Sequence, residues 1–344
     1  MKPSRLLLPL VPLYAAAVAA KNAAYASRLF QPNRLAWPVI SVGNLSTGGA
    51  GKTPFVLALN KLLAEGGWLS DVLTRGHGRQ SSEVALVDPA GDPARFSDEP
   101  LLLARNGLRV YVARDRIHAG CLAERESAAL PRIHILDDGL QHRSLARDIE
   151  IILLLAADLR DHLLPAGNLR EPLSALRRAD VIVLREEDAA LAASLRAHLS
   201  PPPCIWIVRR ALQFRSLDEA TAAAPANALA FCAIARPDDF FVSLSRSGCT
   251  SAATLTFADH HLYTDADCHS LAARAVAARA SVFVCTAKDA VKLTPPLLAI
   301  LTAAAPVIIA DLITTFADST AVADDLTHLL ALVTPQHPCT PAAK

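Results

Sequence analysis

The chain has 344 residues, of which 52% are hydrophobic and 19% are charged. This composition is too apolar for a disordered protein, and the length suggests two domains of roughly 100–200 residues each. A formal net charge of +1 and an aromatic content of 5% argue against a nucleic-acid-binding protein. Seven scattered cysteines without a C-x-x-C pair indicate neither a disulfide framework nor a zinc site.

Residues 1–30 contain an apolar run from Leu6 to Ala20 with basic residues on both sides. A cleaved signal peptide, a buried helix and a helix in the membrane interface all show this pattern. A membrane-spanning helix needs about 20 apolar residues, whereas this run is shorter and contains Pro9 and Pro12. We therefore expect residues 1–30 to form an uncleaved helix that lies in the membrane interface.

Short apolar runs alternate with Ala- and Leu-rich stretches along the chain, which predicts an α/β fold with a parallel sheet covered on both faces. Strands are expected at Val39–Val42, Asp71–Thr74, Arg109–Val112, Ile133–Leu136, Ile149–Leu154, Val181–Leu184 and Ile205–Val208. Helices are expected at Thr53–Glu65, Glu99–Asn106, Arg116–Glu126 and Asp188–Leu199. A second series of strands follows at Leu229–Ile234, Thr254–Phe257, Ser281–Cys285 and Val307–Ile309.

The two series of elements indicate two domains. We expect a P-loop NTPase-like domain at residues 31–212 and a smaller α/β lid domain at residues 228–335. An Ala-rich stretch with Pro225 lies between them, and it is typical of a linker, here residues 213–227.

The segment Ser46-Thr47-Gly48-Gly49-Ala50-Gly51-Lys52-Thr53 follows a predicted strand and begins a predicted helix, as a P-loop does. Its backbone N–H groups and the helix N-terminus can bind phosphates. The expected ATP-binding residues are Thr47, Gly48, Gly49, Ala50, Gly51, Lys52 and Thr53. Lys52 would reach the β- and γ-phosphates and Thr53 would ligate Mg²⁺, although Ser46 stands where the strict pattern has Gly.

The strand Ile133–Leu136 ends in Asp137 and Asp138, which is the form of a Walker B motif. Acidic side chains at the carboxyl end of a parallel strand lie where such sheets bind ligands. An Asp-Gly turn would give the same letters. Next to a P-loop, however, the pair predicts a carboxylate at the metal of the nucleotide.

Several classes of P-loop protein remain after these two motifs. The segment Thr286-Ala287-Lys288-Asp289 has the residue types of a GTPase base-reading motif in the wrong order, and Thr47 replaces the extra lysine of partitioning ATPases. The alternatives to an enzyme are a P-loop NTPase switch that acts on a protein partner and a membrane-associated protein with a degenerate nucleotide site. Intact Lys52 and Asp138 argue against degeneracy.

Further motifs resemble those of the tetraacyldisaccharide 4'-kinases, the lipid A 4'-kinases of Gram-negative bacteria. They cover about residues 38–293 in the family's order. They are Ser41-Val42-Gly43-Asn44-Leu45 before the P-loop, Thr74-Arg75-Gly76-His77-Gly78, Ser97-Asp98-Glu99-Pro100, Asp115-Arg116, Asp137-Asp138-Gly139-Leu140-Gln141-His142, Leu164–Pro172, Phe257–Tyr263 and Lys288–Leu293. The family also tends to lack Gly at position 46. One departure is Ala287, where the family usually has Glu.

This resemblance implies ATP- and Mg²⁺-dependent phosphorylation of the 4'-hydroxyl of a tetraacylated glucosamine disaccharide 1-phosphate. It implies that Asp98 takes the hydroxyl proton with His260 as its partner, that Lys52 is catalytic, and that Thr53, Asp137 and Asp138 surround the metal. Expected contacts to substrate or phosphate are Arg75, Glu99, Arg116, Gln141, His142, Arg170 and Glu171. We expect a monomer that is peripheral or monotopic at the cytoplasmic face of the bacterial inner membrane.

Overall fold

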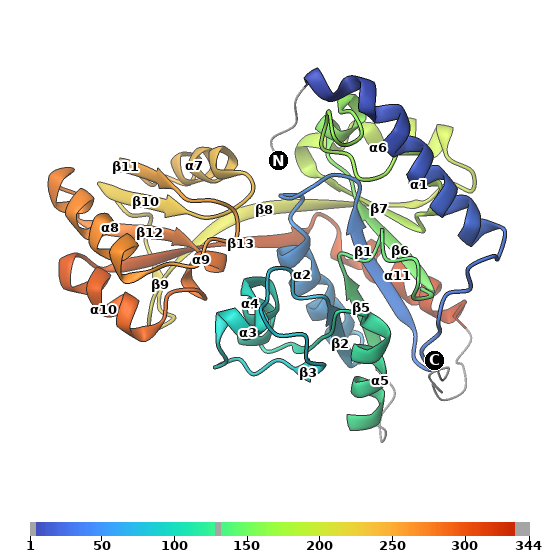
Figure 1. The fold of residues 1–344 in the computed structure, drawn as a ribbon, viewed down its shortest axis with the longest axis horizontal. Coiled ribbons are helices and arrows are strands. Elements are labelled where there is room, and N and C mark those ends of the chain that lie inside the picture. The colour runs from blue at the N-terminus through green and yellow to red at the C-terminus, as the bar shows by residue number, and fades with distance from the viewer. Residues whose placement is uncertain (1–4, 128–131, 334–344) are drawn as a thin grey trace.

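The computed structural model describes residues 5–127 and 132–333. Within these ranges, thirteen strands join in one sheet with the order β11-β10-β12-β13-β8-β7-β6-β1-β5-β2-β4-β3, and β9 pairs with β8 (Figure 1). The strands are β1 Val39–Asn44, β2 Ser70–Thr74, β3 Ala85–Leu86, β4 Arg109–Val112, β5 Ile133–Asp137, β6 Ile149–Leu153, β7 Val181–Arg185, β8 Cys204–Ser216, β9 Thr221–Ala222, β10 Ala228–Cys232, β11 Ser251–Thr256, β12 Val282–Thr286 and β13 Val307–Phe316.

The helices fill the connections between these strands, as the expected α/β fold requires. They are α1 Val11–Ala26, α2 Lys52–Glu65, α3 Pro93–Phe96, α4 Asp98–Arg105, α5 Arg116–Glu126, α6 Leu191–His198, α7 Pro237–Arg246, α8 Asp265–Ala277, α9 Ala287–Ala290, α10 Pro295–Ala304 and α11 Ser319–Ala331. Shorter 3-10 helices are η1 Arg5–Leu10, η2 Ala156–Arg160, η3 Leu173–Arg178 and η4 Glu186–Asp188.

The larger part of the sheet runs from β7 to β3 and is parallel except for β3, which pairs with β4 in the antiparallel sense. Its central strands are buried along their whole length because helices cover both faces. Side chains alternate between two cores: Ile151 packs with Phe55 of α2, whereas Ile152 packs with Leu195 of α6. This parallel α/β architecture confirms the predicted fold class.

Two long strands connect the larger part to the smaller part, which holds β10 to β12 (Figure 1). The first half of β8 pairs in parallel with β7, and its second half pairs with β13 in the antiparallel sense from Val208 to Ser216. The stretch expected to be a linker, residues 213–227, therefore begins inside β8 and includes β9. A two-stranded ribbon joins the parts, and it is formed by residues from both ends of the smaller part.

The C-terminal helix α11 differs from the expected boundary of 228–335 because it belongs to the core of the larger part. Val322, Leu326 and Leu330 repeat at helical spacing and pack in the same core as Phe55 and Leu101. Asp318 begins the helix by accepting a hydrogen bond from the backbone N–H of Ala321 at 3.0 Å. The chain thus returns from the smaller part along β13 to complete the larger one.

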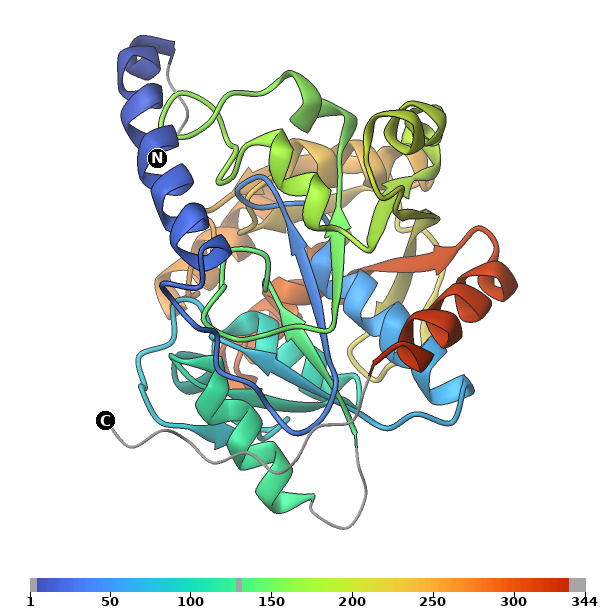
Figure 2. The same cartoon turned by 90° about the vertical axis from the view of Figure 1, so that its right-hand side faces the viewer.

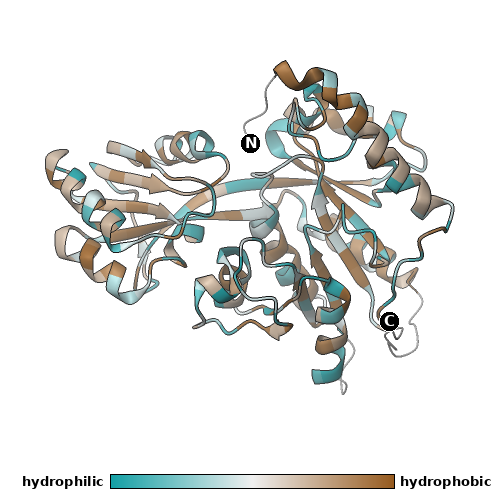
Figure 3. Cartoon of the chain, in the orientation of Figure 1, coloured by the Kyte–Doolittle hydropathy of each residue, from teal (hydrophilic) through white to brown (hydrophobic). Residues whose placement is uncertain are grey.

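The N-terminal helix α1 lies along the outside of the larger part (Figures 1 and 2), and its amino end is hydrophobic (Figure 3). The segment Leu6–Ala26 has 21 residues and contains an 18-residue window with a mean hydropathy of 1.5, so it is long and apolar enough to cross a membrane. Pro9 lies in η1 and Pro12 in the first turn of α1, where a proline costs no hydrogen bond. On the sequence alone, the length of the run and its prolines argue against a membrane span. In the structure, neither feature excludes one.

Candidate active site

The P-loop connects the carboxyl end of β1 to α2. Gly48, Gly49 and Gly51 have φ angles of +67°, +69° and +87°, which residues with a side chain rarely adopt. Space is also tight at two of them, because a Cβ would lie 2.7 Å from the Cβ of Ala235 at residue 48 and 2.5 Å from the side chain of Arg236 at residue 49. Left-handed turns of this kind direct backbone N–H groups into a concave surface that binds anions.

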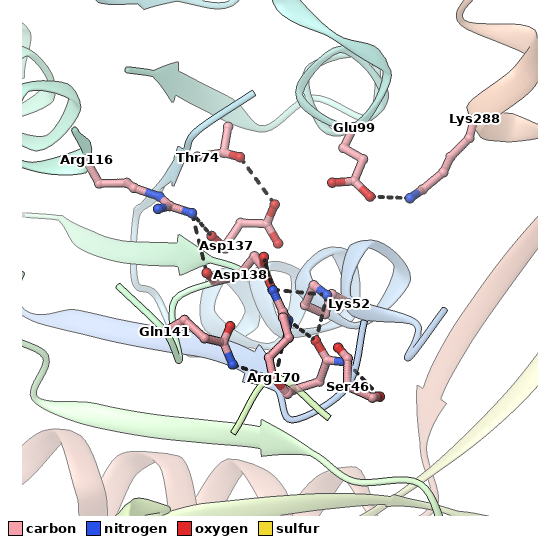
Figure 4. Close-up of polar contacts among 11 residues, drawn as sticks. Ser46, Lys52, Thr74, Glu99, Arg116, Asp137, Asp138, Gln141, Arg170 and Lys288 are labelled. Atoms are coloured by element: carbon pink, nitrogen blue, oxygen red, sulfur yellow. Dashed lines mark hydrogen bonds and ion pairs between the residues drawn. The ribbon is translucent and has the colours of Figure 1, made fainter. Parts of the chain in front are cut away.

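Lys52 begins α2 and joins a network of charged and amide side chains (Figure 4). Its Nζ atom lies 2.8 Å from Asn44 Oδ1 and 3.2 Å from Asp138 Oδ1. Arg170 binds both carboxylate oxygens of Asp138, at 2.8 and 2.9 Å, and also donates to Asn44 Oδ1 at 2.8 Å. The charges of Lys52 and Arg170 outweigh burial and hold the pKa of Asp138 well below its ordinary value.

Asp137 ends β5 and lies beside this network, with 2% of its surface exposed. Burial and the nearby carboxylates of Glu99 and Asp138 raise its pKa. Thr74 donates to its Oδ2 at 3.4 Å, and its buried Oδ1 has no hydrogen-bond partner among the described residues. A cation would satisfy this oxygen and favour the charged carboxylate, so the donor set fits Mg²⁺, which binds few protein ligands besides water and phosphate.

Asp98 and His260 meet across the two parts of the molecule. His260 Nδ1 lies 3.0 Å from both carboxylate oxygens of Asp98, although 162 residues separate them in the sequence. Burial would raise the pKa of Asp98, but the hydrogen bond from His260 and the charge of Lys288 hold it well below its usual range. The same hydrogen bond raises the pKa of His260.

A second contact across the parts lies next to this pair. Glu99, in the first turn of α4, forms an ion pair with Lys288 of α9 (Figure 4). The charge of Lys288 lowers the pKa of Glu99 despite burial. Two consecutive acidic residues therefore bind a histidine and a lysine that come from the smaller part.

Other predicted residues lie around the same centre. Arg116 is 7% exposed and donates to the backbone oxygens of Asp137 and Asp138, at 3.5 and 3.4 Å. Gln141 donates to the backbone oxygen of Asn44 at 3.1 Å. Thr53 is buried behind the loop. These three residues support the loop and β5 on one side of the site.

The remaining predicted residues lie farther from the network or touch it through others. Burial and the charge of Arg116 lower the pKa of His142 to about 4, and its Nε2 lies 3.6 Å from Asp115. Glu171 is buried and binds Arg178 at 2.9 Å rather than a P-loop residue. Arg75 is exposed beside the site, and Thr47 is exposed on the loop. Ala50 is buried.

Three residues of the site were not singled out by sequence reasoning. Asn44 accepts from both Lys52 and Arg170, and its position as the last residue of β1, just before the P-loop, was the available signal. Lys288 lies in the Lys288–Leu293 motif, in which the sequence alone indicates no function for this lysine. Arg236 covers Gly49 from the turn between β10 and α7, and no local pattern points to it.

The fold and the site define a P-loop kinase: an anion-binding loop, an adjacent acidic strand end and a carboxylate–histidine pair within one chain. A family model described as tetraacyldisaccharide-1-P 4'-kinase matches residues 3–331. The chain belongs to this family, which confirms the family, the kinase class and the function predicted from the sequence. An NTPase switch is not favoured.

Curated relatives and a solved structure agree with this assignment. The chain is 45% identical to the tetraacyldisaccharide 4'-kinase of Koribacter versatilis (strain Ellin345), over 83% of this chain and 88% of the relative. It is 38% identical to that of Dechloromonas aromatica (strain RCB), with 83% of each chain covered. The "apo" form of LpxK from Aquifex aeolicus in complex with ATP has a TM-score of 0.75 and 29% identity, covering 94% of this chain and 98% of that one.

Proposed function

We propose that this chain transfers the γ-phosphoryl group of ATP to the 4'-hydroxyl of a tetraacyldisaccharide 1-phosphate, with Mg²⁺ as cofactor. The single observation that carries the mechanism is the Asp98–His260 pair, which lies in the same acidic and basic cluster as the P-loop lysine. Family membership supports the choice of substrate. A switch that only hydrolyses nucleotide has no need of a pair that spans the two parts.

Bound ATP would supply the phosphoryl group, and Mg²⁺ would neutralise charge on its oxygens. Gly48, Gly49 and Gly51 would hold the phosphates, with Thr47, Ala50 and Thr53 completing the loop. Lys52 has its ammonium at the loop's mouth, where it can stabilise negative charge on the transferring group. Thr53, Asp137 and Asp138 would hold the cation.

Asp98 would accept the proton of the attacking 4'-hydroxyl. A carboxylate with a low pKa is a weak base, but phosphoryl transfer has a loose transition state that depends more on positioning than on base strength. His260 would donate a hydrogen bond to Asp98 and so orient the carboxylate as it takes the proton. Arg116, Arg170 and Gln141 would fix the loop and the acidic strand end, and Arg75, Glu99 and His142 would contact substrate or phosphate. The buried Glu171 instead binds Arg178.

The two parts would act as a nucleotide-binding domain and a lid. The contacts Asp98–His260 and Glu99–Lys288 both join the larger part to the smaller one, so the site is complete only when the parts are closed. The β8–β13 ribbon is the connection about which they would move. Because one chain supplies every residue of the site, we propose that the enzyme acts as a monomer.

The apolar segment Leu6–Ala26 supports a position at the membrane surface, where the acyl chains of such a substrate lie. We propose the cytoplasmic face of the inner membrane, because ATP is available there. Incubation of purified protein with ATP, Mg²⁺ and tetraacyldisaccharide 1-phosphate tests the function. Transfer of labelled γ-phosphate to the lipid is expected, whereas ATP hydrolysis without lipid phosphorylation would favour the switch.

A further inference from the structure

A cavity of about 360 Å³ lies at the carboxyl end of α1. Four arginines line it: Arg34, Arg143, Arg147 and Arg178. Tyr25, near the end of α1, forms another wall, and the guanidinium of Arg143 lies 5.2 Å from the centre of its ring. The concentration of guanidinium groups around one hollow distinguishes it from an ordinary charged surface.

Acidic side chains pair with three of these four arginines. Glu150 binds Arg147 at 2.8 Å, Asp148 pairs with Arg34 at 3.4 Å, and Glu171 binds Arg178 at 2.9 Å. Asp180, which also lines the cavity, accepts the backbone N–H of Glu150 at 2.8 Å. Arg143 forms no ion pair within the described ranges, and burial together with the charges of Arg178 and Arg147 lowers its pKa. The buried Nε of Arg178 also lacks a hydrogen-bond partner among the residues described. Arg143 therefore carries a positive charge that is available for an anion.

The cavity is separate from the P-loop. Glu150 lies near the amino end of β6 and Asp180 directly precedes β7. The P-loop follows the carboxyl end of β1, which runs parallel to β6. The cavity and the nucleotide site thus lie toward opposite ends of these strands.

Exposed apolar residues next to the cavity indicate the kind of ligand. Leu29 and Phe30 follow α1 and are 75% and 52% exposed, and the ring of Phe30 lies 5.5 Å from that of Tyr25. Pro32, two residues further on, lines the cavity. Hydrophobic side chains beside guanidinium groups are the arrangement that binds a lipid surface, because the former enter the acyl layer and the latter meet phosphates.

We propose that this cavity binds the phosphate of an anionic phospholipid headgroup and so holds the carboxyl end of α1 at the headgroup layer. The inference rests on the membrane position proposed above, and it adds a lipid site that is distinct from the site of phosphoryl transfer. Arginine suits this role because its planar guanidinium makes paired hydrogen bonds to phosphate oxygens.

The test compares two double variants of the full-length protein in vesicle cosedimentation. Arg34→Gln/Arg143→Gln removes two charged side chains that line the cavity and do not contact a residue of the catalytic site. Arg274→Gln/Arg279→Gln removes two exposed charges from the smaller part as a matched control. We expect the first variant to lose roughly tenfold or more of its affinity for vesicles of phosphatidylcholine with one-fifth phosphatidylglycerol, and the control to lose less than about twofold. Equal losses, or none in the first variant, would overturn the proposal.

Two further measurements separate the sources of phosphate. In detergent micelles without phospholipid, the first variant should keep the kcat and KM of the wild type for tetraacyldisaccharide 1-phosphate. A raised KM there would assign the cavity to the substrate's own phosphate and overturn the phospholipid assignment. Binding of millimolar inorganic phosphate in the cavity, together with unchanged vesicle binding by the first variant, would assign the cavity to free phosphate and overturn the phospholipid assignment. If the wild type itself did not phosphorylate tetraacyldisaccharide 1-phosphate in these micelles, the proposed function would be refuted instead.

Discussion

The contact between Asp98 and His260 leads to a prediction with a defined size. Asp98 has 3% of its side chain exposed, and His260 is its charged hydrogen-bond partner at 3.0 Å. A hydrogen bond to a charged group contributes about 1.5–3 kcal/mol. If His260 acts only through Asp98, His260→Gln should lower kcat by about 10- to 150-fold, because about 1.4 kcal/mol corresponds to a factor of ten.

Asp98→Asn should cost more, about 10²- to 10⁴-fold, because it removes the proton acceptor itself. The double variant should then be little slower than Asp98→Asn, since His260 has lost the group through which it acts. Lipid phosphorylation under saturating ATP measures all three. His261→Gln is the matched control, because this adjacent histidine binds Asp267 at 2.9 Å rather than Asp98. Strictly multiplicative losses of kcat in the double variant would show that Asp98 and His260 act independently.

The same pair predicts how the stability of the folded protein depends on pH. The lowered pKa of Asp98 gives stability that is present above about pH 4 and is lost as pH falls through the folded value. The raised pKa of His260 gives stability that is present below about pH 6.5 and is lost as pH rises through its folded value. Thermal unfolding should show both contributions fully between about pH 4 and 6.5. His260→Gln should flatten the alkaline side, and an unchanged profile would contradict the ion pair.

Three further perturbations test other parts of the site. Lys52→Ala should lower kcat by orders of magnitude and affect ATP binding less, because the backbone of the loop remains; near-normal lipid phosphorylation would contradict the P-loop assignment. Lys288→Gln should raise the pKa of Glu99 and weaken closure, which a reduced kcat and faster proteolysis of the β8–β13 ribbon would reveal; unchanged values of both would show the contact to be dispensable. Deletion of residues 1–30 should reduce vesicle binding and activity on lipid while ATP still binds, and unchanged vesicle binding would refute the membrane role of α1.

The sequence predicted the buried strands well because their apolar runs reflect burial on both faces. It did not predict the extension of β8 and β13. Beyond Val208, β8 carries Arg209, Arg210, Gln213 and Arg215, and half-exposed polar residues in a ribbon resemble those of a linker. Pairing with β13 supplies the hydrogen bonds that make this stretch a strand, and no local pattern contains that information.

The same distinction between local and distant information applies to the site. Spacing alone identifies the P-loop, since the glycines and Lys52 act within one turn. Lys288 meets Glu99 across 189 residues, and only the folded chain shows that a motif without an assigned role completes the acidic helix start. Arg236 reaches Gly49 for a similar reason, because the sheet order places the turn after β10 over the loop.

The position of α1 connects the proposed membrane contact to the active site. Tyr14 donates to the backbone oxygen of Arg170 at 3.0 Å, and Lys21 donates to that of Gln141 at 2.9 Å. Arg170 in turn binds Asp138, which pairs with Lys52. A shift of α1 relative to the larger part would therefore act on the two segments that fix the acidic strand end. The helix that we propose to lie at the membrane thus also supports Asp138 and Lys52, so the proposed membrane contact and phosphoryl transfer would share one set of hydrogen bonds.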